Sequence, residues 1–183
     1  TTYPKFEVEK YGIPRSHTVS LVYLELMNRA WHRTPYIPKP DINLQAWFAE
    51  RFDKAAARKI PPTTDLFVGW SSFSEQSISR AKSYGAVTVV ERGSAHIETQ
   101  YELLKEEYER FGLKPRLPHP AIIEKEKREY ELADYISIPS KFVARSFIDR
   151  GVSEEKLIRC AYGVDLREFR QLPRQDNVFR VVY

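Results

Sequence analysis

This sequence of 183 residues lacks several features that mark common classes of protein. Its single cysteine, Cys160, excludes an internal disulfide framework and fits a reducing compartment. No apolar run reaches the roughly 18 residues that a membrane-spanning helix needs, and the first residues do not form an export signal. We therefore expect a cytoplasmic protein that does not cross a membrane.

Several catalytic and ligand-binding motifs are also missing. There is no G-x-S-x-G, P-loop or G-x-G-x-x-G pattern, which removes the usual signatures of hydrolases, nucleotide hydrolases and dehydrogenases. His17, His32 and His119 share no metal-ligand spacing with one another or with Cys160, so no metal site is predicted. The net charge of +4 is spread over interleaved acids and bases, and we expect no nucleic-acid partner.

The composition, with 42% hydrophobic and 13% aromatic residues, is that of a folded domain. Residues 1–64 match no motif and are expected to be largely helical. A first helix is predicted from Ser16 to Ala30; it is apolar on two sides, and so is expected to be buried nearly all round. An extended linker with three prolines follows, and a second helix is predicted to begin at Asp41 or Asn43 with its large apolar residues inward. These inward residues are Leu44, Trp47, Phe48, Phe52 and Ala55.

The outer edge of that second helix is basic, with Arg51, Lys54, Arg58 and Lys59. We interpret it as an ordinary solvated face in preference to a membrane-surface site. Contact with the periphery of a membrane stays open as the alternative.

Beyond residue 64 the chain alternates between short apolar runs and helical patterns. Residues 66–69, 87–90, 135–138 and 157–160 are predicted to be buried strands, separated by helices near residues 75–84, 97–111, 121–132 and 140–151. This alternation predicts an α/β fold, in which a Rossmann-like parallel sheet is flanked by helices and the four strands are adjacent in one layer.

In an open parallel sheet, ligands bind beyond the carboxyl ends of the strands. The loops that follow the four predicted strands therefore supply the candidate substrate-binding residues, which are Trp70, Ser71, Arg92, Gly93, Ser94, Ser140, Tyr162 and Gly163.

The second of these loops is the richest, because Gly93 permits close approach of the backbone and Arg92 offers a fork for a phosphate or carboxylate. His96 begins the next helix, where the helix dipole keeps the imidazole neutral and suited to orient a hydroxyl; simple capping of the helix is the alternative. Ser140 is expected mainly to cap a helix, and Tyr162 and Gly163 to form a linker turn, although all three can line the crevice.

Two stretches resemble a known family. The pattern A-D-x-I-x-x-P-S-x-F-V-x-x-S-F-I-x-x-G-V from Ala133, continued by Y-G-V-D-x-x-x-F up to Phe169, resembles the end of the N-terminal domain of family 4 (group 1) glycosyltransferases of the GT-B fold. Residues 89–96 resemble the strand and loop that carry the active-site histidine of that domain, and residues 179–183 resemble the first strand of the family's second domain.

The resemblance implies one half of a GT-B enzyme. Residues 1–176 would form the acceptor-side domain, incomplete at its N-terminus, and residues 177–183 would begin an absent nucleotide-sugar-binding domain. The implied reaction is sugar transfer, with retention, from a nucleotide-sugar to a hydroxyl of a glycan, lipid or small-molecule acceptor, with His96 as the catalytic residue and no cofactor or essential metal. A location at the inner face of the membrane is compatible with it.

The sequence also departs from the family. The glycine-rich opening strand and the second domain's E-x7-E motif are missing; Glu98 and Glu106 have that spacing, but they lie on a helix of the first domain, and we interpret the match as chance. We therefore expect this chain to be inactive alone, to bind nucleotide-sugars weakly and to self-associate. The alternative is a non-catalytic α/β module that binds a partner through its basic helix edge.

Overall fold

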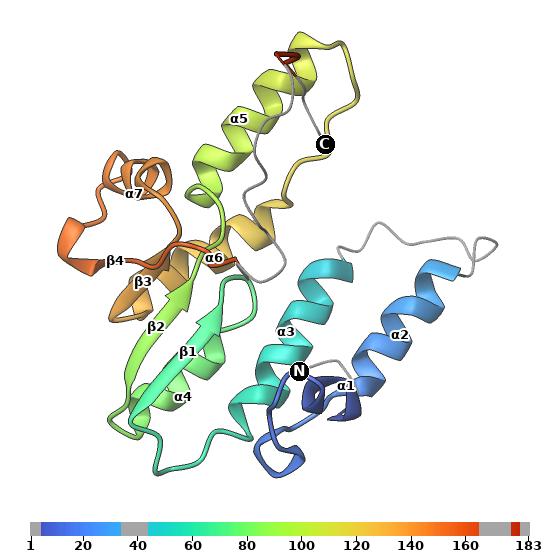
Figure 1. Ribbon diagram of the computed structural model, residues 1–183, viewed down its shortest axis with the longest axis vertical. Helices are drawn as coiled ribbons and strands as arrows, with labels where there is room; N and C mark the ends of the chain where they lie inside the picture. Colours follow the sequence, from blue (N-terminus) through green and yellow to red (C-terminus); the bar gives the residue numbers. More distant parts are fainter. Residues whose placement is uncertain (1–4, 34–43, 165–176, 180–183) are drawn as a thin grey trace.

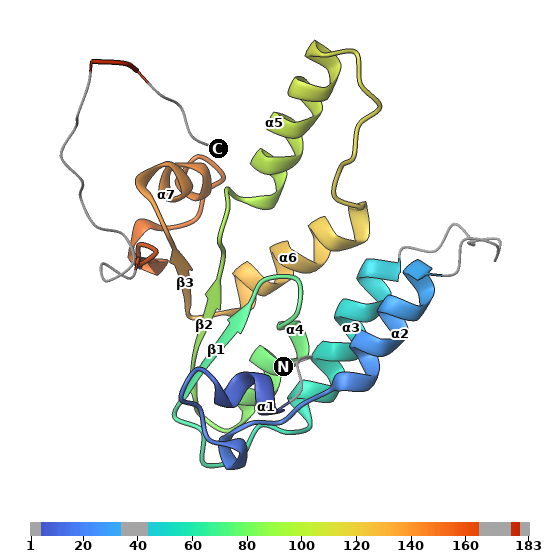
Figure 2. The ribbon, with the colours of Figure 1, turned by 45° about the vertical axis from the view of Figure 1, so that its right-hand side comes forward.

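The computed structural model describes residues 5–33, 44–164 and 177–179 (Figure 1). A helical N-terminal part precedes an α/β part. The N-terminal part contains the short helix α1 (Lys5–Glu9), the 3-10 turn η1 (Arg15–His17), α2 (Val22–Arg33) and α3 (Leu44–Ala57). Figure 2 shows α2 and α3 lying side by side, with α3 next to the helix α4 (Glu75–Ser83) of the α/β part.

The α/β part contains one parallel sheet. Its strands are β1 (Leu66–Trp70), β2 (Val87–Glu91), β3 (Tyr135–Ile138) and β4 (Leu157–Arg159), paired in the order β1-β2-β3-β4. All three pairings are parallel. The predicted Rossmann-like α/β fold is thus confirmed, and so is the prediction that these four strands are neighbours in one layer.

The strand order places the connecting helices on one face of the sheet. Because each strand pairs with the next one along the chain and such crossovers are right-handed, α4, α6 (Pro120–Leu132) and α7 (Lys141–Ile148) cover the same side. The core lies between these helices and the strand residues that point toward them. Its members include Ile78, Val90, Ile97, Tyr130, Ile136, Ile138, Val143 and Phe147.

The opposite face of the sheet is open. Burial alternates along β1, β2 and β3, and the outward residues Leu66, Val68 and Trp70 are each more than half exposed. The prediction of strands buried on both sides was therefore wrong: continuous apolar runs are typical of strands covered on two faces, but the described chain covers only one. Cys160, expected in a buried strand, follows the edge strand β4 and is exposed.

The N-terminal helices also differ from the prediction. Helix α2 begins at Val22 and not near Ser16, which lies in η1. Among the side chains described in and next to this helix, Leu21 and Leu24 are buried, while Leu26 and Met27 are exposed. In α3 the buried side chains are those of Ala49, Asp53 and Ala57, whereas the large aromatic side chains predicted to point inward are only partly buried. Small side chains on this face let α3 approach α4 closely.

Helix α5 (Ile97–Arg110) forms where the periodicity predicts, but it projects away from the body of the domain (Figure 1). Ile97 is buried, whereas Phe111 at the far end is largely exposed, so the apolar stripe is only partly covered. The turns after α4, α5 and α7 contain Gly85, Gly112 and Gly151, close to the ends of the predicted helical ranges, and all three glycines have the positive φ that permits a left-handed turn.

Some predictions concern residues outside the described ranges. The proline linker, the start of the second helix at Asp41 or Asn43, the residues from Asp165 to Phe169 and most of the expected strand at residues 179–183 lie there. Within the described ranges, no helix has the length and apolarity needed to cross a membrane.

Candidate functional site

A groove lies at the carboxyl ends of the strands, where the fold predicts a ligand site. Its volume is about 170 Å³. We call it the strand-end groove; the residues lining it are Trp70, Glu91, Arg92, Gly93, Ser137, Ile138, Pro139, Cys160, Ala161, Tyr162 and Gly163. Of the predicted site residues, the structure brings together Trp70, Arg92, Gly93, Tyr162 and Gly163 here.

Gly93 lies between two aromatic side chains at the centre of this groove. The Tyr162 hydroxyl donates a hydrogen bond to the Gly93 carbonyl oxygen at 3.3 Å. A Cβ at position 93 would run into that hydroxyl and lie 3.3 Å from the Trp70 ring. Trp70 and Tyr162 themselves stay 51% and 69% exposed, so the walls of the groove are aromatic surfaces that a ligand can reach.

Arg92 lies on the groove wall, but its guanidinium is directed into the protein. It forms an ion pair with Glu126 at 2.9 Å, and both side chains are buried. Its Nε donates to the Ala95 carbonyl at 3.1 Å, and its other nitrogens donate to Ser71 and to Gln100. Four hydrogen bonds inside the protein leave no free pair of donors for a phosphate, so the predicted role of Arg92 as a ligand fork is replaced by that of a brace for the loop.

His96 does not line the strand-end groove. It is only 5% exposed, its ring packs edge-on against Phe147 at 5.0 Å between centroids, and its Nδ1 accepts a hydrogen bond from the Glu98 backbone N–H at 3.3 Å. Capping of α5 is therefore confirmed for His96. Burial lowers its pKa to about 4, and the nearby cations of Arg150, Arg92 and Lys127 act in the same direction. The ring is therefore neutral, as expected, but desolvation is the main cause.

The ring borders a different cavity, of about 350 Å³, on the helical side of the sheet. This cavity is also lined by Lys127, Arg150 and Lys156. In this conformation the predicted catalytic histidine and the aromatic groove are thus separate features.

The three predicted serines have structural partners and do not line the groove. Ser140 caps α7, since its hydroxyl accepts from the Val143 N–H at 3.2 Å. Ser71 is buried and accepts from Arg92, and Ser94 donates to Gln100 at 3.0 Å. The expectation that Ser140 acts mainly as a cap is confirmed.

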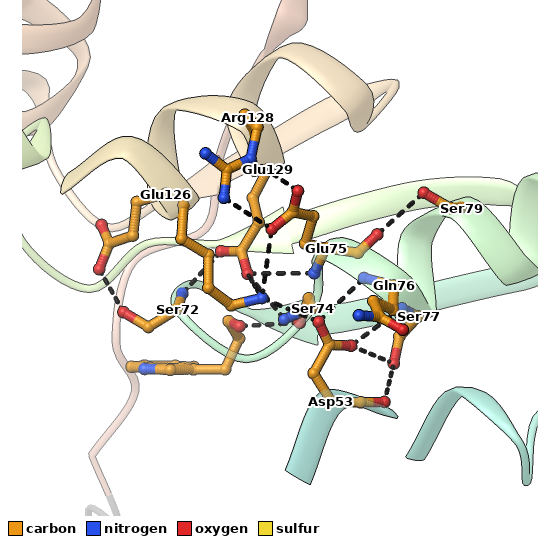
Figure 3. Close-up of polar contacts among 12 residues, drawn as sticks. Asp53, Ser72, Ser74, Glu75, Gln76, Ser77, Ser79, Glu126, Arg128 and Glu129 are labelled. Atoms are coloured by element: carbon orange, nitrogen blue, oxygen red, sulfur yellow. Dashed lines mark hydrogen bonds and ion pairs between the residues drawn. The ribbon is translucent and has the colours of Figure 1, made fainter. Parts of the chain in front are cut away.

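A buried network of carboxylates holds the loop after β1 (Figure 3). Glu129 of α6 is fully buried and accepts from three backbone N–H groups, those of Ser72, Ser74 and Glu75, at 2.6, 2.8 and 3.1 Å. Ser72 has a φ of 73°, an uncommon conformation for a residue with a side chain, and its hydroxyl donates to Glu126. The N–H groups with which this loop could bind a phosphate are therefore taken by the protein's own carboxylates.

Asp53 does the same for the first turn of α4. It accepts from the Gln76 and Ser77 N–H groups, both at 2.9 Å, and pairs with Lys125 at 2.9 Å (Figure 3).

The environment of the network shifts the pKa values of its charged groups. Burial raises the pKa of Glu129 to about 7, while the donors around it favour the charged form. Nearby carboxylates, with Asp53 first, raise the pKa of Lys125 against its desolvation. The network ties α3, α4 and α6 to the loop after β1 and, through Glu126, to Arg92 of the groove lining.

Sequence reasoning missed this network. A signal was present, because Ile122, Glu126, Glu129, Tyr130 and Ala133 lie on one face at helical spacing, so two carboxylates occupy positions of the apolar stripe. Carboxylates at buried positions require donors from other elements, and those donors lie 34 to 57 positions away, in the loops after β1 and β2. Their identity could not be read from the helix alone.

Comparison of the chain with protein-family models, with curated proteins and with solved structures found no match.

Proposed function

We propose that this chain is the acceptor-side domain of a retaining, nucleotide-sugar-dependent glycosyltransferase. The observation that carries the proposal is the strand-end groove, in which Gly93 from one motif stretch meets Tyr162 and Gly163 from the other. Gly93 and Tyr162, which come from the two stretches that resemble the glycosyltransferase family, are 69 positions apart in the sequence, and the convergence of the two stretches on one groove supports a shared role for them.

The lining of the groove suits an uncharged, hydroxyl-rich ligand. Exposed rings of Trp70 and Tyr162 offer flat apolar surfaces, and the Glu91 side chain and the groove's backbone groups offer hydrogen-bond partners. With Arg92 engaged inside the protein, no cation among the described residues that line the groove is directed at a phosphate. These features favour the acceptor as the ligand of this chain. In the proposed enzyme, the phosphate-bearing donor is bound by a second domain.

A volume of about 170 Å³ is below the ~300–1,000 Å³ typical of complete small-molecule sites. In the proposed enzyme, a second domain closes over the groove, excludes water and stabilises the leaving nucleotide. In this proposal His96 acts by positioning its loop, since its ring caps α5, which begins at Ile97, four residues after Gly93. A cytoplasmic location and contact with an anionic membrane surface remain parts of the proposal.

The experiment is a transfer assay on the longest natural form of the protein, with a panel of UDP- and GDP-sugars and glycan and lipid acceptors. We expect release of the nucleoside diphosphate with at least one donor, and a tenfold or greater loss of acceptor-dependent turnover in Trp70→Ala. Lys114→Ala, an exposed site that does not line the groove, serves as the control. Absence of transfer with every donor, or unchanged turnover in Trp70→Ala, would contradict the proposal.

A second candidate function rests on a different surface. A groove of about 630 Å³ between α3 and α4 is lined by Lys54, Arg58 and Arg80, and its one acidic lining residue, Glu75, is bound by Arg128. This arrangement favours an anionic partner, as the alternative of a non-catalytic binding module requires. Binding of anionic vesicles that falls at least fivefold in Lys54→Gln/Arg58→Gln, in a protein without transferase activity, would support this alternative.

A further inference from the structure

The open face of the sheet carries a continuous apolar surface. Its residues share one side of the strands by register, because Leu66 pairs with Val87, Val68 with Val89 and Val89 with Tyr135. We define the open face by Leu66, Val68, Trp70, Val87, Tyr135 and Ile158, which are all between 39% and 58% exposed. Among the described strand residues that point to this side, Glu91 is the one with a charge.

Such a surface is unusual for a parallel sheet. Strands in parallel sheets are normally covered on both faces, and their apolar runs reflect this. The six side chains leave on the order of 600 Å² exposed, at the upper end of the largest apolar patch found on typical monomers. Exposure of this apolar surface to water is therefore unfavourable, and its burial against a partner surface is stabilised by the hydrophobic effect.

We propose that a second copy of this chain covers the open face in a symmetric dimer. The exposed area of about 600 Å² is close to the roughly 800 Å² per partner of a standard interface. The face is made from one side of a sheet, so two copies can stack face to face as two aligned sheets do. A twofold axis uses the same patch on both copies and closes the assembly at two subunits.

The distribution of charge agrees with this arrangement. Glu91 is the last residue of β2, at the carboxyl end of the sheet. When the strands of the two copies run in opposite directions, the two Glu91 carboxylates lie at opposite ends of the interface, so no like charges face each other. The apolar part of the face, which includes Val68, Val87 and Tyr135, then packs on its own counterpart.

The dimer also involves the strand-end groove. Trp70 belongs both to the open face and to the groove lining, and Glu91, its pairing partner on the same side of the sheet, also lines the groove. The partner copy therefore lies beside the mouth of the groove and restricts access to it from this side. This inference does not depend on the proposed transferase activity.

The test is sedimentation velocity across a range of concentrations on the full chain and two variants. Val68→Lys introduces a charge on the open face at the middle of β1, where the residue is 51% exposed, and Met27→Lys introduces the same charge at a 48% exposed apolar site on α2. We expect a concentration-dependent dimer, a dissociation constant at least tenfold weaker in Val68→Lys, and no change in Met27→Lys. Thermal unfolding checks that both variants remain folded.

A second measurement fixes the geometry. In a Cys160→Ser background, Val68→Cys is expected to cross-link between copies with a short bis-maleimide, whereas Met27→Cys is not. A chain that is monomeric at all concentrations, species larger than a dimer, or a dimer that is lost in Met27→Lys and kept in Val68→Lys would each overturn the proposal.

Discussion

The hydroxyl of Tyr162 donates a hydrogen bond to the carbonyl oxygen of Gly93 across the strand-end groove, at 3.3 Å. The two residues belong to loops that follow β2 and β4, strands that are not neighbours in the sheet. Their contact bridges the groove over β3, and it depends on the missing side chain at position 93. This relationship makes the groove a site that substitution can test.

Replacement of Gly93 by alanine should displace Tyr162 and narrow the groove. The tyrosine ring is exposed and free to turn outward, so we expect a loss of stability below about 1 kcal/mol but a tenfold or greater loss of acceptor-dependent turnover. Gly163→Ala is the matched control, because nothing lies within 4 Å of a Cβ built at that position. Equal turnover in both variants would show that the groove does not bind the acceptor.

Replacement of Glu129 by glutamine should destabilise the fold, because an amide cannot accept from all three loop N–H groups without turning its own donors toward them. We expect a loss of about 2–4 kcal/mol in the free energy of unfolding, measured by urea denaturation. Glu131→Gln, on the exposed side of the same helix, should stay within about 0.5 kcal/mol. Similar losses for the two variants would argue against the network as a determinant of stability.

The pH dependence of stability should carry the signature of His96. Its pKa is about 4 in the folded chain and 6.5 as the ordinary value, so the unfolded state binds a proton first as the pH falls. The contribution of neutral His96 is therefore fully present above pH 6.5 and is lost progressively as the pH falls toward 4. In His96→Gln the decline in unfolding free energy over this window should be smaller than in the parent chain, and an identical decline would assign it to other groups.

Truncation of His96 to alanine should also reduce stability. The substitution removes a helix cap and leaves a gap beside Tyr130 and Phe147, at a cost of about 2–4 kcal/mol in thermal unfolding. His119→Ala removes a comparable cap from α6 at a more exposed site and should cost about 1 kcal/mol. A loss no larger for His96 than for His119 would show that packing of the ring contributes little.

Cys160 provides a direct probe of the groove. The thiol is exposed in the native chain and lines the strand-end groove, so N-ethylmaleimide should modify it without denaturant. A bound acceptor should slow this reaction at least threefold in a stopped time course followed by mass spectrometry. Modification at an unchanged rate with saturating acceptor would place the acceptor elsewhere.

The sequence alone predicted the α/β class, the four strands and the helices between them, because these follow from apolar runs, helical periodicity and the glycines at Gly85, Gly112 and Gly151. It also predicted that Gly93 and Tyr162 lie at the same edge of the sheet, since carboxyl ends of parallel strands meet there. These properties are local or follow from topology, and no knowledge of packing was needed for them.

Only the tertiary structure decided which of these residues face the groove. Arg92 and His96 lie in the predicted loop, but the buried Glu126 draws the guanidinium inward and the space between Tyr130 and Phe147 takes the imidazole. The exposure of Cys160 and of the sheet's open face could likewise not be predicted from the sequence. An apolar run indicates that a strand favours apolar contacts on both faces, but it does not show whether the described chain contains elements that cover both faces. The burial of a residue depends on how all the helices and strands pack together, so it cannot be predicted from the local pattern of the sequence alone.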